Sequence, residues 1–418
     1  MNTYPPLAEL LTPVHMWADP ANEAVSALGS HVNFSDGTDA ICAISGLWNA
    51  NLGYGNKAVA NAIHEVNLAA STMPLFRRSS SIAREAASAL LDFARPHRFA
   101  TCWFSTSGSA ALDACVKLVR QYHALRGNPT RKRIVSFSGS YHGTTAGAMA
   151  VTGEYLLQDI YGIDERLHIK IPHDDPEAFE RIARRYGADI AGVIIEPILG
   201  SGARIVSESM IDTILRLREE HGFSVVADEV ATGFNRTGPR FASHLWAKAP
   251  NVLITSKALT NGTCAAAALL VDEHIVHAFQ TMGAVFWHGE TQAGGPQSAA
   301  AILATISEFE RLDVTAESVR VAKRLDTFIA DYIVLSARVS EDGRGCFRAL
   351  RLLGPGGETL DGGQIAEVVR EAHRAGVLVQ PGPSCIQLVP NLLMSDNDLD
   401  ELFRRLRTVL DSFLGIDA

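Results

Sequence analysis

Two short apolar runs of this sequence end in side chains that could do chemistry. Residues 223–227 are followed by two adjacent carboxylates, Asp228 and Glu229, and residues 252–255 lie just before Lys257. Runs of this length and composition are typical of buried strands in a parallel sheet. Because ligands bind at the carboxyl ends of such strands, we expect a carboxylate and a lysine amine to face one crevice.

A carboxylate and a lysine in one crevice are what pyridoxal phosphate requires. The lysine amine forms the covalent link, and an anion beside the pyridine nitrogen keeps that nitrogen protonated, so that the ring can accept electrons. Taken alone, a carboxylate at a strand end more often caps a helix, and a lysine there is more often solvated. Of the seven lysines, however, only Lys257 directly follows an apolar run and precedes a run of small residues.

Several longer motifs carry a family resemblance. ADEVATGFNRTG (227–238) and TSKAL (255–259) resemble the class III aminotransferases, the fold type I pyridoxal phosphate enzymes that include ω-amino acid and amine transaminases. Further segments match in the family's order: SGLWNANLGYGN (45–56), STSGSAALDA (105–114), GSYHGTT (139–145), IIEPILGSGA (194–203) and HGETQAGGP (288–296). The resemblance covers residues from about 30 to about 415, and ordered matches are stronger evidence than any single motif.

The phosphate of the cofactor is expected at a helix N-terminus. Ser107, Gly108 and Ser109 lie between an expected strand and an expected helix, where unpaired N–H groups and the helix dipole bind anions. The family usually has a glutamate after this motif, whereas this chain has Ala110. That difference removes one polar contact and leaves the phosphate site itself intact.

The resemblance assigns further cofactor contacts. Lys257 would hold the cofactor and transfer protons, and Asp228 would stabilise the protonated pyridine. Tyr141 would stack on the ring; the remaining cofactor residues are expected to be His142, Glu196 and Val230. In the family, the threonine at the position of Thr291 binds the phosphate of the other subunit, so the resemblance implies a homodimer with shared sites.

For the substrate pocket, the sequence leaves two interpretations open. Trp48 matches a pocket position of amine transaminases, although a core tryptophan explains it equally well. Family members acting on α-amino acids usually hold the substrate carboxylate with an arginine of the C-terminal domain, where this chain has Gln380 and Gln387. We therefore expect a main substrate without an adjacent carboxylate, such as an aldehyde, a ketone or a modified terminus. The alternative is another arginine, with Arg77, Arg78 and Arg348 as the candidates.

Composition excludes other classes of function. A formal net charge of −9 argues against nucleic acid as a partner. Six scattered cysteines without a CxxC pair, and histidines without HExxH, predict no metal and a reducing compartment. No signal peptide and no apolar window of membrane-spanning length is visible, so we expect a cytoplasmic protein.

The expected architecture is α/β. We expect a large domain with a mostly parallel sheet of the seven-stranded type covered by helices (56–310), a smaller α/β C-terminal domain (311–418) and an N-terminal arm (1–55). An amino donor and a carbonyl acceptor would be the substrates. A mutase, epimerase or decarboxylase of the same fold is the alternative. A nucleotide-binding oxidoreductase would need a GxGxxG between a strand and a helix, which the chain lacks, and a non-catalytic protein would not need this set of site residues.

Overall fold

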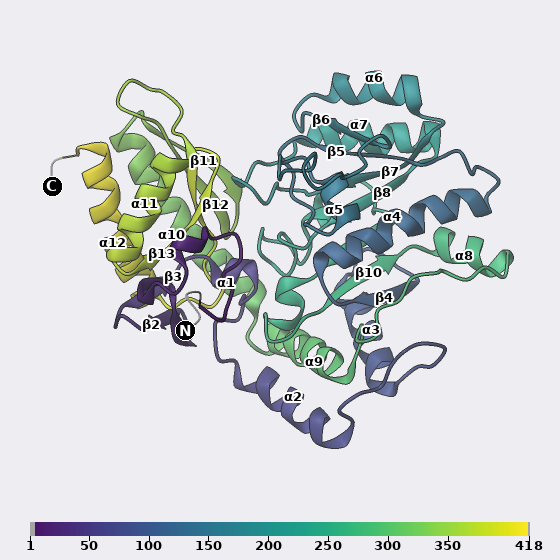
Figure 1. The fold of residues 1–418 in the computed structure, drawn as a ribbon, viewed down its shortest axis with the longest axis horizontal. Coiled ribbons are helices and arrows are strands. Elements are labelled where there is room, and N and C mark those ends of the chain that lie inside the picture. Colours follow the sequence, from purple (N-terminus) through teal and green to yellow (C-terminus); the bar gives the residue numbers. More distant parts are fainter. Residues whose placement is uncertain (1–4, 417–418) are drawn as a thin grey trace.

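A seven-stranded sheet positions the candidate site in this computed structural model, which describes residues 5–416 (Figure 1). The strand order is β4-β10-β9-β8-β7-β5-β6, and only β10 runs antiparallel to its neighbours. The strands are β4 (Thr101–Ser105), β5 (Arg133–Phe137), β6 (His168–Ile171), β7 (Ile190–Ile195), β8 (Ser224–Asp228), β9 (Val252–Thr255) and β10 (Ala267–Val271). The expected α/β fold with a mostly parallel sheet is confirmed.

Helices cover both faces of this sheet, which explains why its central strands are continuously apolar. Every residue of β7, β8, β9 and β10 is buried. One face packs against α4 (Gly108–Leu125), α5 (Ala146–Val151) and α8 (Glu273–Thr281), and the other packs against α6 (Pro176–Tyr186) and α7 (Glu208–His221).

Side-chain caps fix where these helices begin. Ser107, Asp175, Ser207 and Asp272 each accept a hydrogen bond from a backbone N–H in the first turn of α4, α6, α7 and α8. Such a cap satisfies one of the N–H groups that a helix start leaves unpaired. For α4, the motif STSGS predicted the start of the helix to within one residue.

Two smaller sheets and their helices form the other part of the molecule. Their orders are β1-β2-β3-β13 and β11-β12-β15-β14, and β3 pairs with β13 in parallel. The N-terminal strands therefore lie beside the C-terminal segment, as the purple and yellow-green ribbons show (Figure 1). The strands are β1 (Ala24–Leu28), β2 (His31–Phe34), β3 (Asp39–Cys42), β11 (Val339–Arg344), β12 (Phe347–Leu352), β13 (Val377–Leu378), β14 (Gln380–Gly382) and β15 (Cys385–Leu388).

The remaining helices connect these parts. They are α1 (Ser45–Trp48), α2 (Lys57–Ala69), α3 (Ser81–Phe93), α9 (Pro296–Arg311), α10 (Val314–Leu335), α11 (Gly362–Arg374) and α12 (Asp396–Leu414), with short 3-10 turns η1 (Val14–Met16), η2 (Pro20–Asn22), η3 (Ala242–Leu245) and η4 (Lys257–Thr260). A single apolar core runs from α3 through α9 and α10 to α12. The domain boundaries at 55 and 310 stay a prediction. Within residues 5–416, no helix is both long and apolar enough to cross a membrane.

Candidate active site

The carboxyl edge of the parallel strands brings the predicted residues together. Asp228 ends β8, Lys257 follows β9, and Glu196 follows β7. β4 is antiparallel to β10, which is antiparallel to β9, so β4 and the start of α4 point toward the same edge. The sequence placed these groups at one edge of the sheet because it assigned the strands correctly.

Lys257 stands at the start of η4 in a left-handed conformation, with φ of 48°. Its Nζ lies 4.7 Å from the ring centroid of Trp48, so the structure places this tryptophan in the site. Burial lowers the pKa of Lys257, and the positive charge of Arg236 lowers it further, while Glu196 and Asp228 oppose both effects. A lowered pKa leaves more of the amine uncharged, which is the nucleophilic form.

Asp228 is a buried carboxylate held on both oxygens. Its Oδ2 lies 2.7 Å from His142 Nδ1, and its Oδ1 accepts a hydrogen bond of 3.2 Å from the backbone N–H of Val230. Burial by itself lowers the pKa of His142, but the hydrogen bond and charge of Asp228, together with the charge of Glu196, raise it above its ordinary value. A protonated His142 would balance the Asp228 charge.

The neighbouring carboxylate, Glu229, has a different task. It is fully buried and accepts hydrogen bonds from the N–H groups of Ala242 and Ser243 and from the Thr232 hydroxyl. Those bonds anchor the loop that follows β8. Of the two adjacent carboxylates, Asp228 therefore remains for the site, where it contacts His142.

Glu196 connects the loop that follows β5 to the loop that follows β7. Its carboxylate accepts hydrogen bonds from the N–H of Tyr141 at 2.8 Å and of Gly200 at 3.0 Å. Burial raises the pKa of Glu196 well above its usual range, although His142 opposes this and Asp228 adds to it. Tyr141 remains 39% exposed, so its ring is open to a ligand on one side.

The first turn of α4 has the features of an anion site. Within residues 5–416, the backbone N–H groups of Gly108 and Ser109 donate to no acceptor. The side chain of Ser107 instead caps the helix by accepting from the Ala110 N–H. Gly143 approaches this turn so closely that a Cβ there would lie 2.0 Å from Ser109 Oγ. The motif at 139–145 therefore packs directly on the phosphate motif.

Gln387 is a buried residue of β15. It is 1% exposed and stands opposite Gln380 on β14 and Ala349 on β12. Ala349 belongs to an apolar cluster against which Trp48 packs, so Gln387 faces the same side. Its Oε1 has no hydrogen-bond partner within the described chain.

The three arginines that could instead bind a substrate carboxylate differ in whether their side chains are already paired. Arg348 is 8% exposed and already pairs with Asp326 and Glu341. Arg77 and Arg78 are exposed, and neither side chain makes a hydrogen bond or an ion pair within residues 5–416. Within residues 5–416, none of the three side chains contacts Lys257 or Asp228.

The comparison with protein families decides the classification. The family model described as aminotransferase class-III matches residues 18–410. The chain belongs to the class III aminotransferases. It is a pyridoxal phosphate-dependent enzyme that transfers an amino group from a donor to a carbonyl acceptor.

Relatives of this aminotransferase cover most of its length. The adenosylmethionine-8-amino-7-oxononanoate aminotransferase of Nitratidesulfovibrio vulgaris is 31% identical over 91% of this chain and 76% of its own. The putrescine–pyruvate aminotransferase of Pseudomonas aeruginosa is 28% identical over 92% and 89%. An amine transaminase structure from an uncultivated Pseudomonas species, in its PLP-bound form, has a TM-score of 0.89 at 26% identity, covering 99% of both chains.

The residues of this aminotransferase fit pyridoxal phosphate. The unpaired N–H groups of Gly108 and Ser109 suit a phosphate, the buried carboxylate of Asp228 suits a protonated ring nitrogen, and the Lys257 amine suits a covalent link. A Cβ at position 108 would lie 3.3 Å from both Val230 methyl groups, which is closer than ordinary contact. Only glycine at position 108 therefore lets Val230 pack against the start of α4 without crowding. When bound, the cofactor supplies a carbon that condenses with amines and a ring that withdraws electrons.

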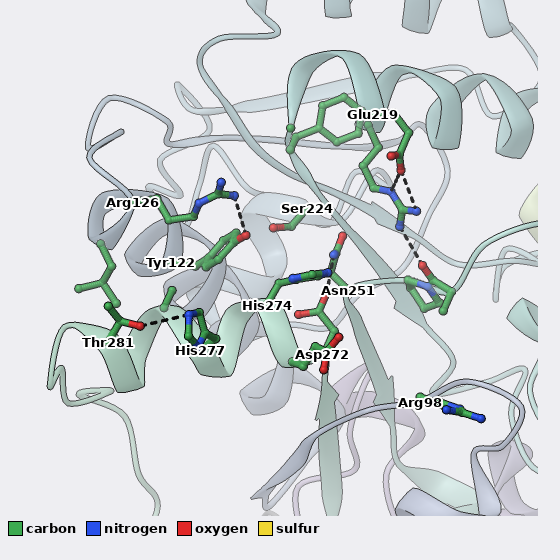
Figure 2. Close-up of a pocket in the computed structure, with 18 of the residues that line it drawn as sticks. Arg98, Tyr122, Arg126, Glu219, Ser224, Asn251, Asp272, His274, His277 and Thr281 are labelled. Carbon is green, nitrogen blue, oxygen red and sulfur yellow. Dashed lines mark hydrogen bonds and ion pairs between the residues drawn. The ribbon is translucent and has the colours of Figure 1, made fainter.

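A second hollow lies away from this site. It measures about 750 Å³ and is lined by Ser224, Tyr122, His274 and His277 among others (Figure 2). Ser224 begins β8 and Asp228 ends it, so the hollow opens at the opposite edge of the sheet, about 13 Å along the strand. No three His, Cys, Asp or Glu side chains within residues 5–416 are placed to hold a metal ion.

Two residues of the site region escaped the sequence analysis. Arg236 is buried between the two parts of the molecule, and Glu290 binds the end of β4 through Ser105 and Thr106. Both lie inside motifs that the sequence analysis recognised. Their contacts come from distant segments, however, and no local pattern signals them.

Proposed function

We propose that this aminotransferase holds its cofactor in the crevice at the carboxyl edge of the seven-stranded sheet. The first turn of α4 would bind the phosphate, Asp228 the ring nitrogen, and Tyr141 and Val230 the two ring faces. The observation that carries the proposal is the convergence of Lys257, Asp228 and the free N–H groups of α4 at one edge. Ser107 would contribute mainly as the helix cap, because its side chain already accepts from Ala110.

The protein groups have distinct tasks in the transfer. Lys257 Nζ, released when the donor amine binds, would take a proton from the donor carbon that bears the amine and return one on the acceptor side. Asp228 would keep the ring nitrogen protonated, while His142 holds the carboxylate in place. Glu196 would keep the loops at Tyr141 and Gly200 closed around the crevice.

The test is the visible absorbance of the purified protein. The wild type is expected to show the long-wavelength band of a cofactor joined to a lysine, and Lys257→Ala is expected to lose both the band and the transfer activity. Lys248→Ala, an exposed lysine that pairs with Glu219, is the matched control and should keep both. A wild-type protein that gains no band with added cofactor would contradict the proposal.

The main substrate is proposed to carry its amine or carbonyl without an adjacent carboxylate. A carboxylate beside the reacting carbon would meet the neutral amide of Gln387, and Arg348 is engaged by two carboxylates. Replacing a cation by an amide removes a charge-assisted pair that stabilises by about 1.5–3 kcal/mol. The co-substrate is proposed to be an ordinary amino or keto acid.

Comparing kcat/KM for a primary amine with that for the matching α-amino acid tests this substrate class. We expect the amine to be preferred, and we expect Gln387→Arg to narrow or reverse the ratio of the two kcat/KM values. A preference for the α-amino acid that Gln387→Ala leaves unchanged, and that Arg77→Ala or Arg78→Ala abolishes, would overturn the proposal.

We also propose a homodimer with shared sites and a cytoplasmic location. Thr291 is exposed in the single chain, and exposed apolar side chains surround its loop, among them Trp287 at 79% and Phe76 at 56%. Large exposed apolar side chains gathered on one surface mark contact sites.

The proposed cytoplasmic location is supported by the cysteines. All six are free, as is usual in a reducing compartment.

A further inference from the structure

Arg236 is a fully buried guanidinium that faces only neutral acceptors. Its Nη1 donates to the carbonyl oxygens of Pro390 and Cys346, and its Nη2 donates to Asn51 Oδ1 and Ser45 Oγ. Burying a charge without an opposite charge is costly, and an apolar side chain of similar length is often no less stable in such a place. Stability alone therefore gives no reason for this arginine.

The acceptors of Arg236 come from two segments that are far apart in the sequence. Asn51 and Ser45 belong to the N-terminal segment, and Cys346 and Pro390 to the C-terminal segment, while Arg236 itself follows β8. In return, the backbone carbonyl of Arg236 accepts from the Cys346 N–H at 2.9 Å. One side chain thus joins the N-terminal and C-terminal segments to the loop that follows Asp228.

The N-terminal segment that Arg236 contacts is strained. The four residues Ser45–Trp48 have φ of 46°, 56°, 60° and 62°, which is a left-handed turn. Only one of the four is glycine, and consecutive L-residues avoid this conformation unless their surroundings impose it. Ser45 Oγ also donates to the Val389 carbonyl at 2.6 Å, so tertiary hydrogen bonds hold the turn at its first residue.

The left-handed turn places the Trp48 indole beside Lys257. The Trp48 indole lies 4.7 Å from Lys257 Nζ and meets Phe347 edge-on at 5.8 Å. The same segment rests on the loop after Lys257, where a Cβ on Gly262 would lie 2.7 Å from the Asn49 Cβ. The position of the tryptophan over the lysine therefore depends on the geometry of the turn.

We propose that Arg236 is a positioning residue of the active site, which holds the Ser45–Trp48 turn so that the indole stays over Lys257 and which supplies a fixed positive charge near that amine. The inference rests on the proposed role of Lys257. Burial is the main cause that lowers the pKa of Lys257; Arg236 acts in the same direction, against the charges of Glu196 and Asp228. Geometry and charge are thus two separable contributions of one side chain.

An experiment on the holoenzyme distinguishes the effect of Arg236 on the geometry of the turn from the effect of its charge. The pH midpoint of the visible band reports the protonation of the nitrogen that joins Lys257 to the cofactor, and visible circular dichroism reports the asymmetric surroundings of the cofactor. Arg236→Met should move the midpoint to higher pH by up to about one unit and change the dichroism. Arg236→Lys should restore the midpoint but not the dichroism, because an ammonium cannot reach four acceptors in a fixed fork.

The matched control is Arg240→Met in the same loop, whose guanidinium pairs with Glu310. It should leave both signals at their wild-type values. An unchanged midpoint in Arg236→Met, a wild-type dichroism in Arg236→Lys, or equal changes in Arg240→Met would each overturn the proposal. A wild-type protein without any visible band would instead contradict the proposed function, so the two failures are distinguishable.

Ser45→Ala tests the geometry of the turn while the positive charge of Arg236 is retained. It removes the hydroxyl that contacts Arg236 and Val389, and it should change the dichroism while leaving the midpoint in place. In a Trp48→Phe background the same substitution should have little further effect, since both act through the indole. Additive effects of the two substitutions would overturn the proposal even if Arg236→Met failed to fold.

Discussion

Glu196 is a buried carboxyl whose charged form the fold disfavours. Burial raises its pKa, and the charge of Asp228 adds to the effect. Between the pKa of an unfolded glutamate, about 4.3, and the raised folded value, the native state binds more protons than the unfolded state, so stability falls as pH rises through this window. We predict that the free energy of unfolding, measured by urea denaturation, falls less for Glu196→Gln than for the wild type when the pH is raised from about 5 to about 8.

Glu310→Gln is the control for this prediction, because Glu310 lies on the surface in an ion pair with Arg240. It should keep the pH dependence of the wild type. Equal pH slopes for the wild type and Glu196→Gln would mean that the buried carboxyl is not the source of the dependence.

At the scale of single residues, the sequence located the groups that follow strands. Asp228 and Lys257 were predictable because each ends a short apolar run, and the parallel-sheet rule then places both at one edge. Arg236 was not predictable. Its acceptors are Ser45, Asn51, Cys346 and Pro390, which lie more than a hundred residues away in either direction along the chain.

The start of α4 is the element on which the phosphate site depends. A Cβ at Gly108 would lie 3.3 Å from both methyl groups of Val230, so the helix start or Val230 must move in Gly108→Ala. We predict that Gly108→Ala weakens cofactor binding by about tenfold, or about 1.4 kcal/mol, in a titration of the visible band. The double variant Gly108→Ala with Val230→Ala should recover part of this loss.

The control lies at the other end of the same helix. Gly127 has φ of 81° and open space around its Cβ, so Gly127→Ala should lower stability through backbone strain alone. Its cofactor affinity should equal that of the wild type. Wild-type affinity in Gly108→Ala, or no recovery in the double variant, would show that the approach of Val230 does not matter.

Elements were predictable where local chemistry sets their ends. The start of α4 was predictable, because the small polar residues 107–109 follow a strand and Ser107 caps the helix. The left-handed turn Ser45–Trp48 was not predictable, because its residues have no local preference for that conformation and the hydrogen bonds of Ser45 with Val389 and Arg236 hold it. The sequence therefore left Trp48 undecided between core and pocket.

For the whole molecule, the pairing of β3 with β13 explains why an N-terminal segment reaches the site. It fixes the chain near residue 42 against the C-terminal segment, only three residues before the turn that carries Trp48. The sequence analysis predicted an N-terminal arm at 1–55, but strand pairing across more than three hundred residues leaves no local pattern that would predict its partner.

The shared-site dimer makes a prediction for mixed subunits. Thr291 is exposed, while its neighbour Glu290 binds Ser105 and Thr106 of the same chain, so the loop is anchored with Thr291 facing outward. If Thr291 completes the partner's phosphate site, a dimer of one Lys257→Ala and one Thr291→Ala subunit holds one intact site. Random exchange should then restore about a quarter of the wild-type activity, at a cofactor concentration that saturates only the wild type.

A second mixture serves as the control. Lys257 and Asp228 lie in the crevice of one chain, so a dimer of Lys257→Ala and Asp228→Asn subunits has a defect in each site and should recover nothing. Exchange must be shown independently, for example by mass spectrometry of differently tagged subunits. If dimers exchange and the Thr291→Ala mixture stays as inactive as the Asp228→Asn mixture, Thr291 acts within its own chain or not at all, and the sites are not shared.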